Sequence, residues 1–355
     1  MDPSFREKQL QDGAVLDPSG ATPLSFGDPA REAAAALEGC VAADRSLLGR
    51  IRLLGRDRRD YLHRLSTGDV RNLRPGEGRL TALLTPKGRI LDLLHALAAE
   101  RALLLVTSAG TGGKVRAWLD GFLFREEVTL EDAGSLPCLG LYGPESPGIL
   151  GRIAGGMWDD LPPAHHRIVG IAGAPVKVVR THPIAGCGFL LLGEEGNALP
   201  LWEELLRGGA VPAGSEALDR LRIAAGIPEA GKELTEDYNP WEAGLDAAIS
   251  LTKGCYTGQE VVARLHHYGK VQRRLAGMRL EGTPPPAGSA VSAGDEEIGS
   301  VTSAAFSPEG EGSAALGILA LRRADAGTEV TVRWHGGETR GRIIPLPAPG
   351  PGPLP

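Results

Sequence analysis

Residues 253–260 have the sequence Lys-Gly-Cys-Tyr-Thr-Gly-Gln-Glu. The spacing of Thr257 and Glu260 is that of a capping box, so we expect Thr257 to be the N-cap of a helix and Glu260 its third residue. Apolar residues then recur at helical spacing as far as Tyr268, and Gly269 suits the left-handed position that follows many helices. The segment is therefore predicted to be a glycine-flanked loop that leads into a short helix.

Cys255 is the candidate for chemistry in this loop. It lies two residues before the predicted N-cap, where unpaired N–H groups and the helix dipole create a positive potential, and Lys253 adds a cation. Both effects favour a thiolate, so we predict that Cys255 is catalytic and that Lys253 supports it. Redox chemistry, cluster ligation and nucleophilic attack all stay open for this thiol. The alternatives are a small residue in a tight turn and a solvated lysine.

The overall composition is that of an ordinary globular protein with more than one domain: 355 residues, 42% hydrophobic and 23% charged. The net charge of −6 argues against a general nucleic-acid binder, so direct tRNA binding is doubtful. No apolar run approaches the roughly 20 residues of a membrane span. The first residues lack the basic and apolar regions of a signal peptide. We therefore expect a cytoplasmic protein without membrane contact.

The four cysteines, Cys40, Cys138, Cys187 and Cys255, are far apart in the sequence. No Cys-x-x-Cys pair occurs, so no metal site is predicted. The first three lie among small or apolar residues and are expected to be buried packing thiols. Cys255 is the exception among them because of its charged and glycine-rich surroundings.

The hydrophobic pattern predicts an α+β protein with antiparallel sheets and a C-terminal β-barrel. A first group of strands and helices is expected at 50–54, 58–65, 80–84, 90–98, 103–107 and 115–122. A second group is expected at 139–142, 176–179, 189–192, 199–207 and 215–225, and short strands follow from residue 273. The predicted divisions are a lead-in (1–40), two α+β regions (41–135 and 136–272), a barrel (273–344) and a disordered proline-rich tail (345–355). Within the lead-in, Asp28 and Pro29 predict the start of a helix.

Several motifs together resemble one protein family. The stretches 222–229 (Arg-Ile-Ala-Ala-Gly-Ile-Pro-Glu), 240–245 (Pro-Trp-Glu-Ala-Gly-Leu) and 253–260 resemble the YgfZ family. Its members are folate-binding proteins related to the T-protein, or aminomethyltransferase, of the glycine cleavage system. The segment 65–90 is similar to the first half of that fold, and the segment 298–317 resembles its C-terminal barrel.

This resemblance implies three domains in a ring around a channel that binds tetrahydrofolate. It also implies a role in iron–sulfur cluster assembly or repair and thereby in tRNA methylthiolation, with client proteins such as the tRNA methylthiotransferase. The alternative is a tetrahydrofolate-dependent aminomethyltransferase or one-carbon transferase. Aminomethyltransferases carry paired aspartates where this chain has only Asp92, and a glutamate where the stretch 180–189 has no acid. Since acid–base groups contribute about 10²–10⁴ in rate, their loss favours the first interpretation.

Six residues are candidates for folate contacts: Asp92, Tyr238, Trp241, Gln259, Arg264 and Arg274. Asp92 would hydrogen-bond a pterin or an amine, and the two aromatic rings would stack on a planar group. The two arginines belong to a basic cluster, with no acid nearby in the sequence, that suits a folate glutamate tail or an RNA phosphate. Its members are Arg264, Lys270, Arg273 and Arg274. The alternatives are a plain strand carboxylate, two packing rings, a solvated glutamine and a solvated basic helix end.

Overall fold

The computed structural model describes residues 2–346, which form two compact units. Unit 1 contains the chain up to residue 64 together with 68–81 and 93–218. Unit 2 contains 65–67, 82–92 and the chain from residue 219 onward. Neither unit is therefore a continuous segment of the chain. Within residues 2–346, no helix has both the length and the apolar composition that a membrane span requires.

The first sheet of unit 1 has six strands, in the order β10 (His166–Ile171), β11 (Ala174–Ala185), β12 (Cys187–Leu192), β9 (Cys138–Tyr142), β3 (Val41–Asp44) and β13 (Val211–Pro212). Its neighbouring strands are antiparallel except for the short parallel pair β13 and β3. Every residue of β9 and β12 is buried. This agrees with their nearly continuous apolar sequences, which are typical of strands covered on both faces.

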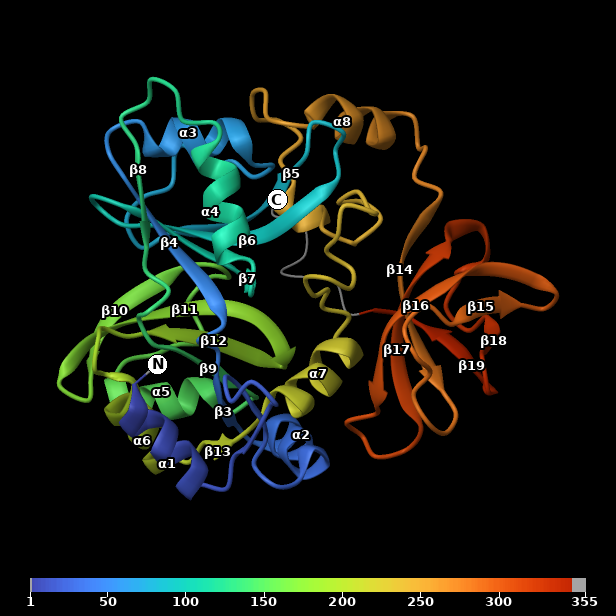
Figure 1. Cartoon of the computed structure of the whole chain (residues 1–355), viewed down its shortest axis with the longest axis horizontal. Helices are drawn as coiled ribbons and strands as arrows, with labels where there is room; N and C mark the ends of the chain where they lie inside the picture. Colours follow the sequence, from blue (N-terminus) through green and yellow to red (C-terminus); the bar gives the residue numbers. More distant parts are fainter. Residues whose placement is uncertain (1, 347–355) are drawn as a thin grey trace. The chain divides into compact units, whose positions relative to one another are not determined.

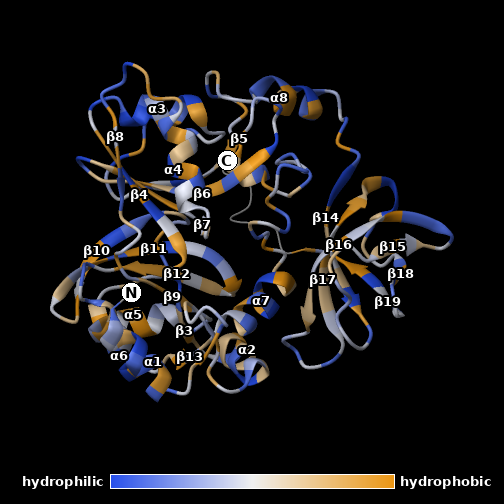
Figure 2. Cartoon of the chain, viewed as in Figure 1, coloured by the Kyte–Doolittle hydropathy of each residue, from blue (hydrophilic) through white to orange (hydrophobic). Residues whose placement is uncertain are grey.

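One face of the six-stranded sheet is covered by helices α1 (Pro3–Gln11), α5 (Ser146–Ala154) and α6 (Ala198–Arg207) (Figure 1). Phe5, Ile149 and Trp202 from these helices pack with Leu141 and Phe189 of the sheet. The helices alternate hydrophilic and hydrophobic residues in Figure 2, as expected when one helix face is buried and the other is solvated. Phe5 therefore places the start of the chain in the core.

The second sheet has five strands, in the order β5 (Gly78–Leu84), β6 (Ile90–Ala98), β7 (Leu103–Ala109), β4 (Leu48–Leu54) and β8 (Thr129–Asp132). Helices α3 (Arg58–Leu65) and α4 (Gly112–Asp120) accompany it. Within unit 1, Leu97 and Val106 of this sheet pack against Cys138, Leu190 and Leu192 of the six-stranded sheet. The two sheets of unit 1 thus face each other across an apolar layer.

The remaining short elements of the N-terminal part are β1 (Val15–Leu16), β2 (Pro23–Ser25) and α2 (Pro29–Glu38). The Asp28 carboxylate accepts hydrogen bonds from the backbone N–H groups of Ala30 and Arg31. This confirms the predicted start of a helix at Asp28 and Pro29.

Unit 2 contains a closed barrel with the strand order β14 (Arg273–Leu280), β17 (Ser313–Ala320), β16 (Glu296–Phe306), β15 (Ala290–Ala293), β18 (Glu329–Trp334) and β19 (Gly337–Ile344). Met278, Val291, Leu319 and Val332 fill its interior. The chain before the barrel forms α7 (Ser215–Ala224), the 3₁₀ turn η1 (Asp246–Ala248) and α8 (Gln259–His267), and a second 3₁₀ turn, η2 (Leu321–Arg323), follows β17. Two α/β domains with antiparallel sheets plus this barrel confirm the predicted fold class.

Arg222, the first residue of the stretch 222–229, belongs to a buried ion network in unit 2. Arg222 Nε lies 2.6 Å from Asp219 Oδ1, and its Nη2 donates to Ser303 Oγ on β16 at 2.9 Å. Ser303 in turn donates to the fully buried carboxylate of Glu233 at 2.6 Å. Since a buried charge is costly unless it is paired, this network fixes the segment after α7 to the barrel.

The end of the described chain also packs in unit 2. Leu346, which the sequence analysis placed in the tail, contacts the core cluster of Ile223, Leu275 and Leu316. The rest of the predicted disordered tail, residues 347–355, lies outside the described residues.

Candidate functional site

Lys253 is buried at the base of the loop that precedes α8, with 9% of its surface exposed. Its Nζ donates to the Ser66 carbonyl at 2.6 Å, and the ammonium lies 5.1 Å from the ring centre of Tyr256. The backbone N–H of Lys253 donates to Ser250 Oγ at 3.2 Å. The alternative of a solvated lysine is therefore wrong, because this side chain anchors the loop to the segment 65–67.

Cys255 is exposed on the same loop and forms no disulfide. The other three cysteines are buried free thiols, as predicted. Burial raises the pKa of the Cys40 and Cys138 thiols to about 11 and also raises the pKa of Cys187. Among the four, only Cys255 is thus accessible to a reagent or a partner.

The predicted capping box is wrong, because α8 begins at Gln259 and its N-cap is Gly258. Gly258 has a φ of +82°, and a Cβ there would lie 2.7 Å from the Thr85 carbonyl oxygen and 3.1 Å from Gly88 Cα. The close approach of the Thr85–Gly88 turn thus requires glycine at this position. Cys255 consequently lies one residue farther from the helix N-terminus than the sequence predicted.

The predicted end of α8 is confirmed. Gly269 has a φ of +58°, its N–H donates to the His266 carbonyl at 3.2 Å, and the Lys270 N–H donates to the Leu265 carbonyl at 3.0 Å. These two hydrogen bonds form a Schellman motif, which satisfies carbonyl groups left unpaired at the helix end.

Trp241 packs against α8 and is 7% exposed. Its Nε1 donates to the Val262 carbonyl at 3.0 Å, and its ring stacks on His266 with 4.9 Å between the centres and 23° between the planes. The indole N–H and one ring face are thus engaged within the protein, as in the packing alternative. Stacking of Trp241 on a ligand stays a prediction.

Tyr238 lies next to the β5–β6 turn. Its carbonyl accepts a hydrogen bond from the Ile90 N–H at 3.1 Å, and the Arg273 guanidinium lies 5.3 Å from its ring centre. Burial raises the pKa of the Tyr238 hydroxyl. One ring face therefore already carries a cation, and a contact with folate stays a prediction.

The segment at Tyr238 is held by a capping arrangement that the sequence analysis missed. Asn239 Oδ1 accepts from the N–H groups of Trp241 and Glu242 at 3.0 and 3.1 Å, and Glu242 Oε2 accepts from the Asn239 N–H at 2.9 Å. The spacing Asn-x-x-Glu was the available signal. Glu242 also pairs with Arg273 at 2.6 Å, which joins this turn to the start of the barrel.

The basic cluster receives acids from other parts of the sequence. Besides the Arg273–Glu242 pair, Arg274 Nη2 lies 2.5 Å from Asp246 Oδ2. Within the part of the chain that the structure describes, Arg264 and Lys270 are exposed and have no carboxylate partner. Arg274 is therefore already ion-paired, whereas Arg264 is open to an anion.

The last two candidates differ in burial. Asp92, on β6, is fully buried, whereas Gln259 is half-exposed in the first turn of α8.

These contacts define one group of segments within unit 2, here called the cysteine-loop group. It consists of the turn at 85–90, the segment 238–242, the loop 250–258 and α8. Across residues 2–346, no three His, Cys, Asp or Glu side chains are grouped so that they could hold a metal ion.

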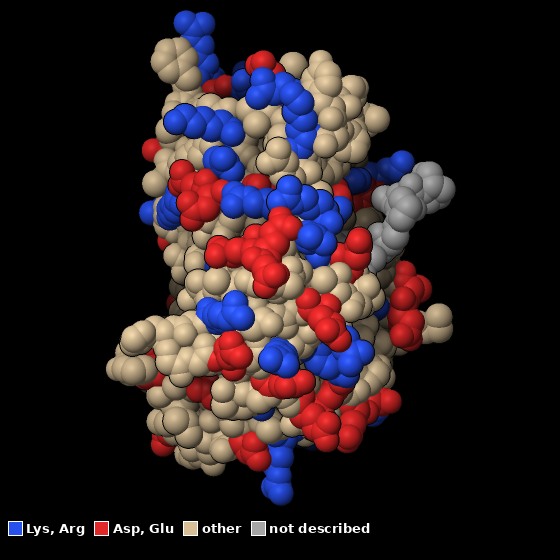
Figure 3. Space-filling model, turned by 90° about the vertical axis from the view of Figure 1, so that its right-hand side faces the viewer, with Lys and Arg blue, Asp and Glu red and all other residues tan. Residues whose placement is uncertain are grey.

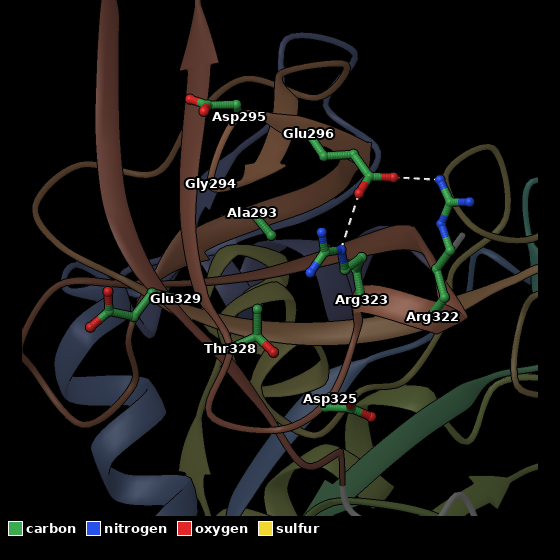
Figure 4. Close-up of a pocket in the computed structure, with 9 residues that line it drawn as sticks. All are labelled: Ala293, Gly294, Asp295, Glu296, Arg322, Arg323, Asp325, Thr328 and Glu329. Carbon is green, nitrogen blue, oxygen red and sulfur yellow. Dashed lines mark hydrogen bonds and ion pairs between the residues drawn. The ribbon is translucent and has the colours of Figure 1, made fainter.

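A hollow of about 730 Å³ lies on the barrel and contains none of the predicted site residues (Figure 4). Glu296 accepts hydrogen bonds there from Arg323, at 3.0 Å, and from Arg322. The face shown in Figure 3 likewise has acidic and basic side chains next to one another. Within this hollow, Glu296 and the two arginines are thus already paired with one another.

Comparison with known proteins matches nearly the whole chain. Residues 13–253 match the family model of the GCVT N-terminal domain, and residues 273–348 match that of the glycine cleavage T-protein C-terminal barrel domain. The chain belongs to the glycine cleavage T-protein family. Cys255 and α8 lie between the two matched regions, so neither family model accounts for them.

Individual proteins are also similar to this T-protein family member along most of its length. It is 35% identical to "Putative transferase At1g60990, chloroplastic" of Arabidopsis thaliana, over 87% of this chain and 71% of that protein. It is 33% identical to an aminomethyltransferase of Geobacillus kaustophilus, over 92% and 91% of the two chains. The crystal structure of glycine cleavage system aminomethyltransferase T from Bartonella henselae superposes with a TM-score of 0.86 at 25% identity, covering 96% of each chain.

Proposed function

We propose that this protein binds tetrahydrofolate and transfers an aminomethyl or other one-carbon unit to or from it. The observation that carries this proposal is the match to aminomethyltransferases along nearly the full chain, through both family domains. The comparisons thus favour the alternative from the sequence analysis over an iron–sulfur role. The shared fold alone would not assign a reaction.

Asp92 is the residue that we expect to act in the transfer. It is a fully buried carboxylate on β6, at the place where aminomethyltransferases carry paired aspartates. Hydrogen bonding to a pterin or to an amine is the role that we propose for it. The stretch 180–189, at the end of β11 and the start of β12, supplies no second acid. We therefore expect transfer about 10²–10⁴ slower than in relatives with a complete acid–base set.

Calorimetric titration with tetrahydrofolate tests the binding, and the folate-dependent release of ammonia from an aminomethyl donor of the glycine cleavage system tests the transfer. Asp92→Asn should lower the transfer rate by about 10²-fold or more. Asp132→Asn, an exposed aspartate on β8, is the matched control and should leave the rate unchanged. Absence of saturable tetrahydrofolate binding would contradict the proposal outright.

We propose as a second candidate the YgfZ-type role, in which Cys255 supports iron–sulfur cluster assembly or repair for clients such as the tRNA methylthiotransferase. The observation that favours it is an exposed free thiol on a loop anchored by buried Lys253. Deletion of the gene from its host should then reduce methylthiolated tRNA, and wild type but not Cys255→Ala should restore it. Equal rescue by both would eliminate this candidate, whereas tetrahydrofolate-dependent transfer should survive Cys255→Ala.

A further inference from the structure

Unit 1 contains a cavity of about 220 Å³ at the border of the apolar layer between its two sheets. Leu192 in the cavity wall belongs to that layer, and Leu104 packs against it. Leu136, Ile168 and Pro175 continue the apolar lining. The wall residues come from the region of β4, β10, β11 and the turn between β6 and β7, elements labelled in Figure 1.

Three cations and one acid complete the lining: Arg50, Arg52, Lys177 and Glu194. Arg50 is 2% exposed, and its guanidinium donates to the Ser46 carbonyl at 2.7 Å and to the carbonyls of Leu48, Gly134 and Leu136. Arg52 pairs with Glu131 at 3.3 Å. Both guanidinium groups therefore already have partners within the protein, carbonyl oxygens for Arg50 and a carboxylate for Arg52.

Lys177 has no carboxylate counterion. Among residues 2–346, no carboxylate lies within ion-pair distance of its ammonium, and Glu194 is exposed at the rim without an ion pair. The polar contact of Lys177 Nζ is with His166 Nε2 at 3.5 Å. Burial, followed by the charge of Lys177, lowers the pKa of His166 to about 4, so this imidazole is neutral at pH 7.

The surroundings of Lys177 disfavour its charge. Burial, with a smaller effect of Arg52, lowers the pKa of the Lys177 ammonium. A half-buried cation against apolar walls has lost hydration without gaining a negatively charged partner. A bound anion would replace that hydration with a charge-assisted hydrogen bond, while its apolar part would displace water from the leucine-lined wall.

We propose that this cavity binds a small organic monoanion, with its carboxylate at Lys177 and its apolar body against Leu104 and Leu192. Of the three lining cations, Lys177 is the one that has neither a carbonyl nor a carboxylate partner within the described chain, so the charge of the ligand is matched to it. The cavity volume equals that of about seven water molecules and is smaller than typical sites for drug-sized ligands. The ligand is thus a short branched or single-ring carboxylate. The site shares no residue with the cysteine-loop group, and the proposal is independent of the function proposed above.

Benzoate is a suitable probe, with benzyl alcohol as its neutral counterpart. Titration of the full-length protein, labelled at the Ile, Leu and Val methyl groups, should show saturable NMR shifts for Ile168, Leu104 and Leu192. Lys177→Met should weaken benzoate binding by roughly tenfold or more, because a hydrogen bond to a charged group is lost. Lys114→Met removes the same charge from an exposed position on α4 and should leave binding unchanged. Benzyl alcohol should bind roughly tenfold or more weakly than benzoate.

The same Lys177→Met variant should melt at a higher temperature than wild type in the absence of ligand, because a half-buried charge without a counterion has been removed. A purely structural lysine would give the opposite shift. Ala102→Leu, which fills the cavity while keeping Lys177, should also abolish binding and serves as the test if Lys177→Met does not fold. Binding of benzoate that is unaffected by these changes would overturn the proposal, as would equal affinity for benzyl alcohol or tenfold tighter binding of phenyl phosphate.

Discussion

At the residue scale, the four cysteines differ in their access to solvent. Cys40 and Cys138 are buried and have a pKa of about 11, so almost none of either is thiolate near pH 8. Cys255 lies on an exposed loop whose position is held by Lys253 and its bond to Ser66. Because the thiolate is the reactive species, these differences should appear directly in a labelling experiment.

We predict that one thiol equivalent reacts rapidly with Ellman's reagent in the native protein at pH 8. Cys255→Ser should remove this fast phase, because the remaining three thiols are buried. In denaturant, wild type should show four equivalents and the variant three. A fast phase that persists in Cys255→Ser would show that one of the buried thiols becomes accessible in solution.

At the element scale, the start of α8 shows where local sequence signals fail. Thr257 and Glu260 match a capping box, yet the N-cap is Gly258, because the turn at 85–88 approaches too closely for a side chain there. The C-terminal signal at Gly269 is purely local, and the prediction from it was correct. A contact between segments about 170 positions apart in the chain cannot be read from an eight-residue motif.

Gly258→Ala should therefore destabilise the protein. The substitution forces a side chain into a left-handed conformation, which costs about 1–2 kcal/mol, and places its Cβ 2.7 Å from the Thr85 carbonyl oxygen. We expect a loss of about 2–4 kcal/mol in the free energy of unfolding, measured by urea denaturation. Gly254→Ala in the same loop is the control, since a Cβ at Gly254 meets no atom within 4 Å. Equal effects of the two substitutions would contradict the close approach as the cause.

At the scale of the whole molecule, regular elements with a clear hydrophobic period were predictable. The expected helix at 58–65 and strand at 90–98 match α3 and β6 to the residue. The division into units was not predictable, because the segments 65–67 and 82–92 join unit 2 only through contacts distant in sequence. The same limitation affected the candidate site, where the acids opposite Arg273 and Arg274 come from residues 242 and 246.

Three buried or partly buried histidines make stability depend on pH. His166 is 5% exposed, and burial, then the charge of Lys177, lowers its pKa to about 4. In the same unit His95 and His182 lie 5.6 Å apart, and burial lowers their pKa values to about 3 and about 4. An unfolded histidine binds a proton near pH 6.5. Between pH 6.5 and about 4 the unfolded chain therefore binds protons that the folded chain does not, so stability falls as the pH falls.

We expect each such histidine to lower the free energy of unfolding by about 1.4 kcal/mol for every pH unit in this window. Urea denaturation followed by tryptophan fluorescence, from pH 7.5 to 4.5, measures the slope. His166→Gln should reduce the slope by about 1.4 kcal/mol per pH unit, the contribution of one proton, because glutamine does not titrate. The substitution is also expected to change the stability at pH 7.5. A slope unchanged by this substitution would mean that His166 binds its proton equally in the folded and unfolded chain.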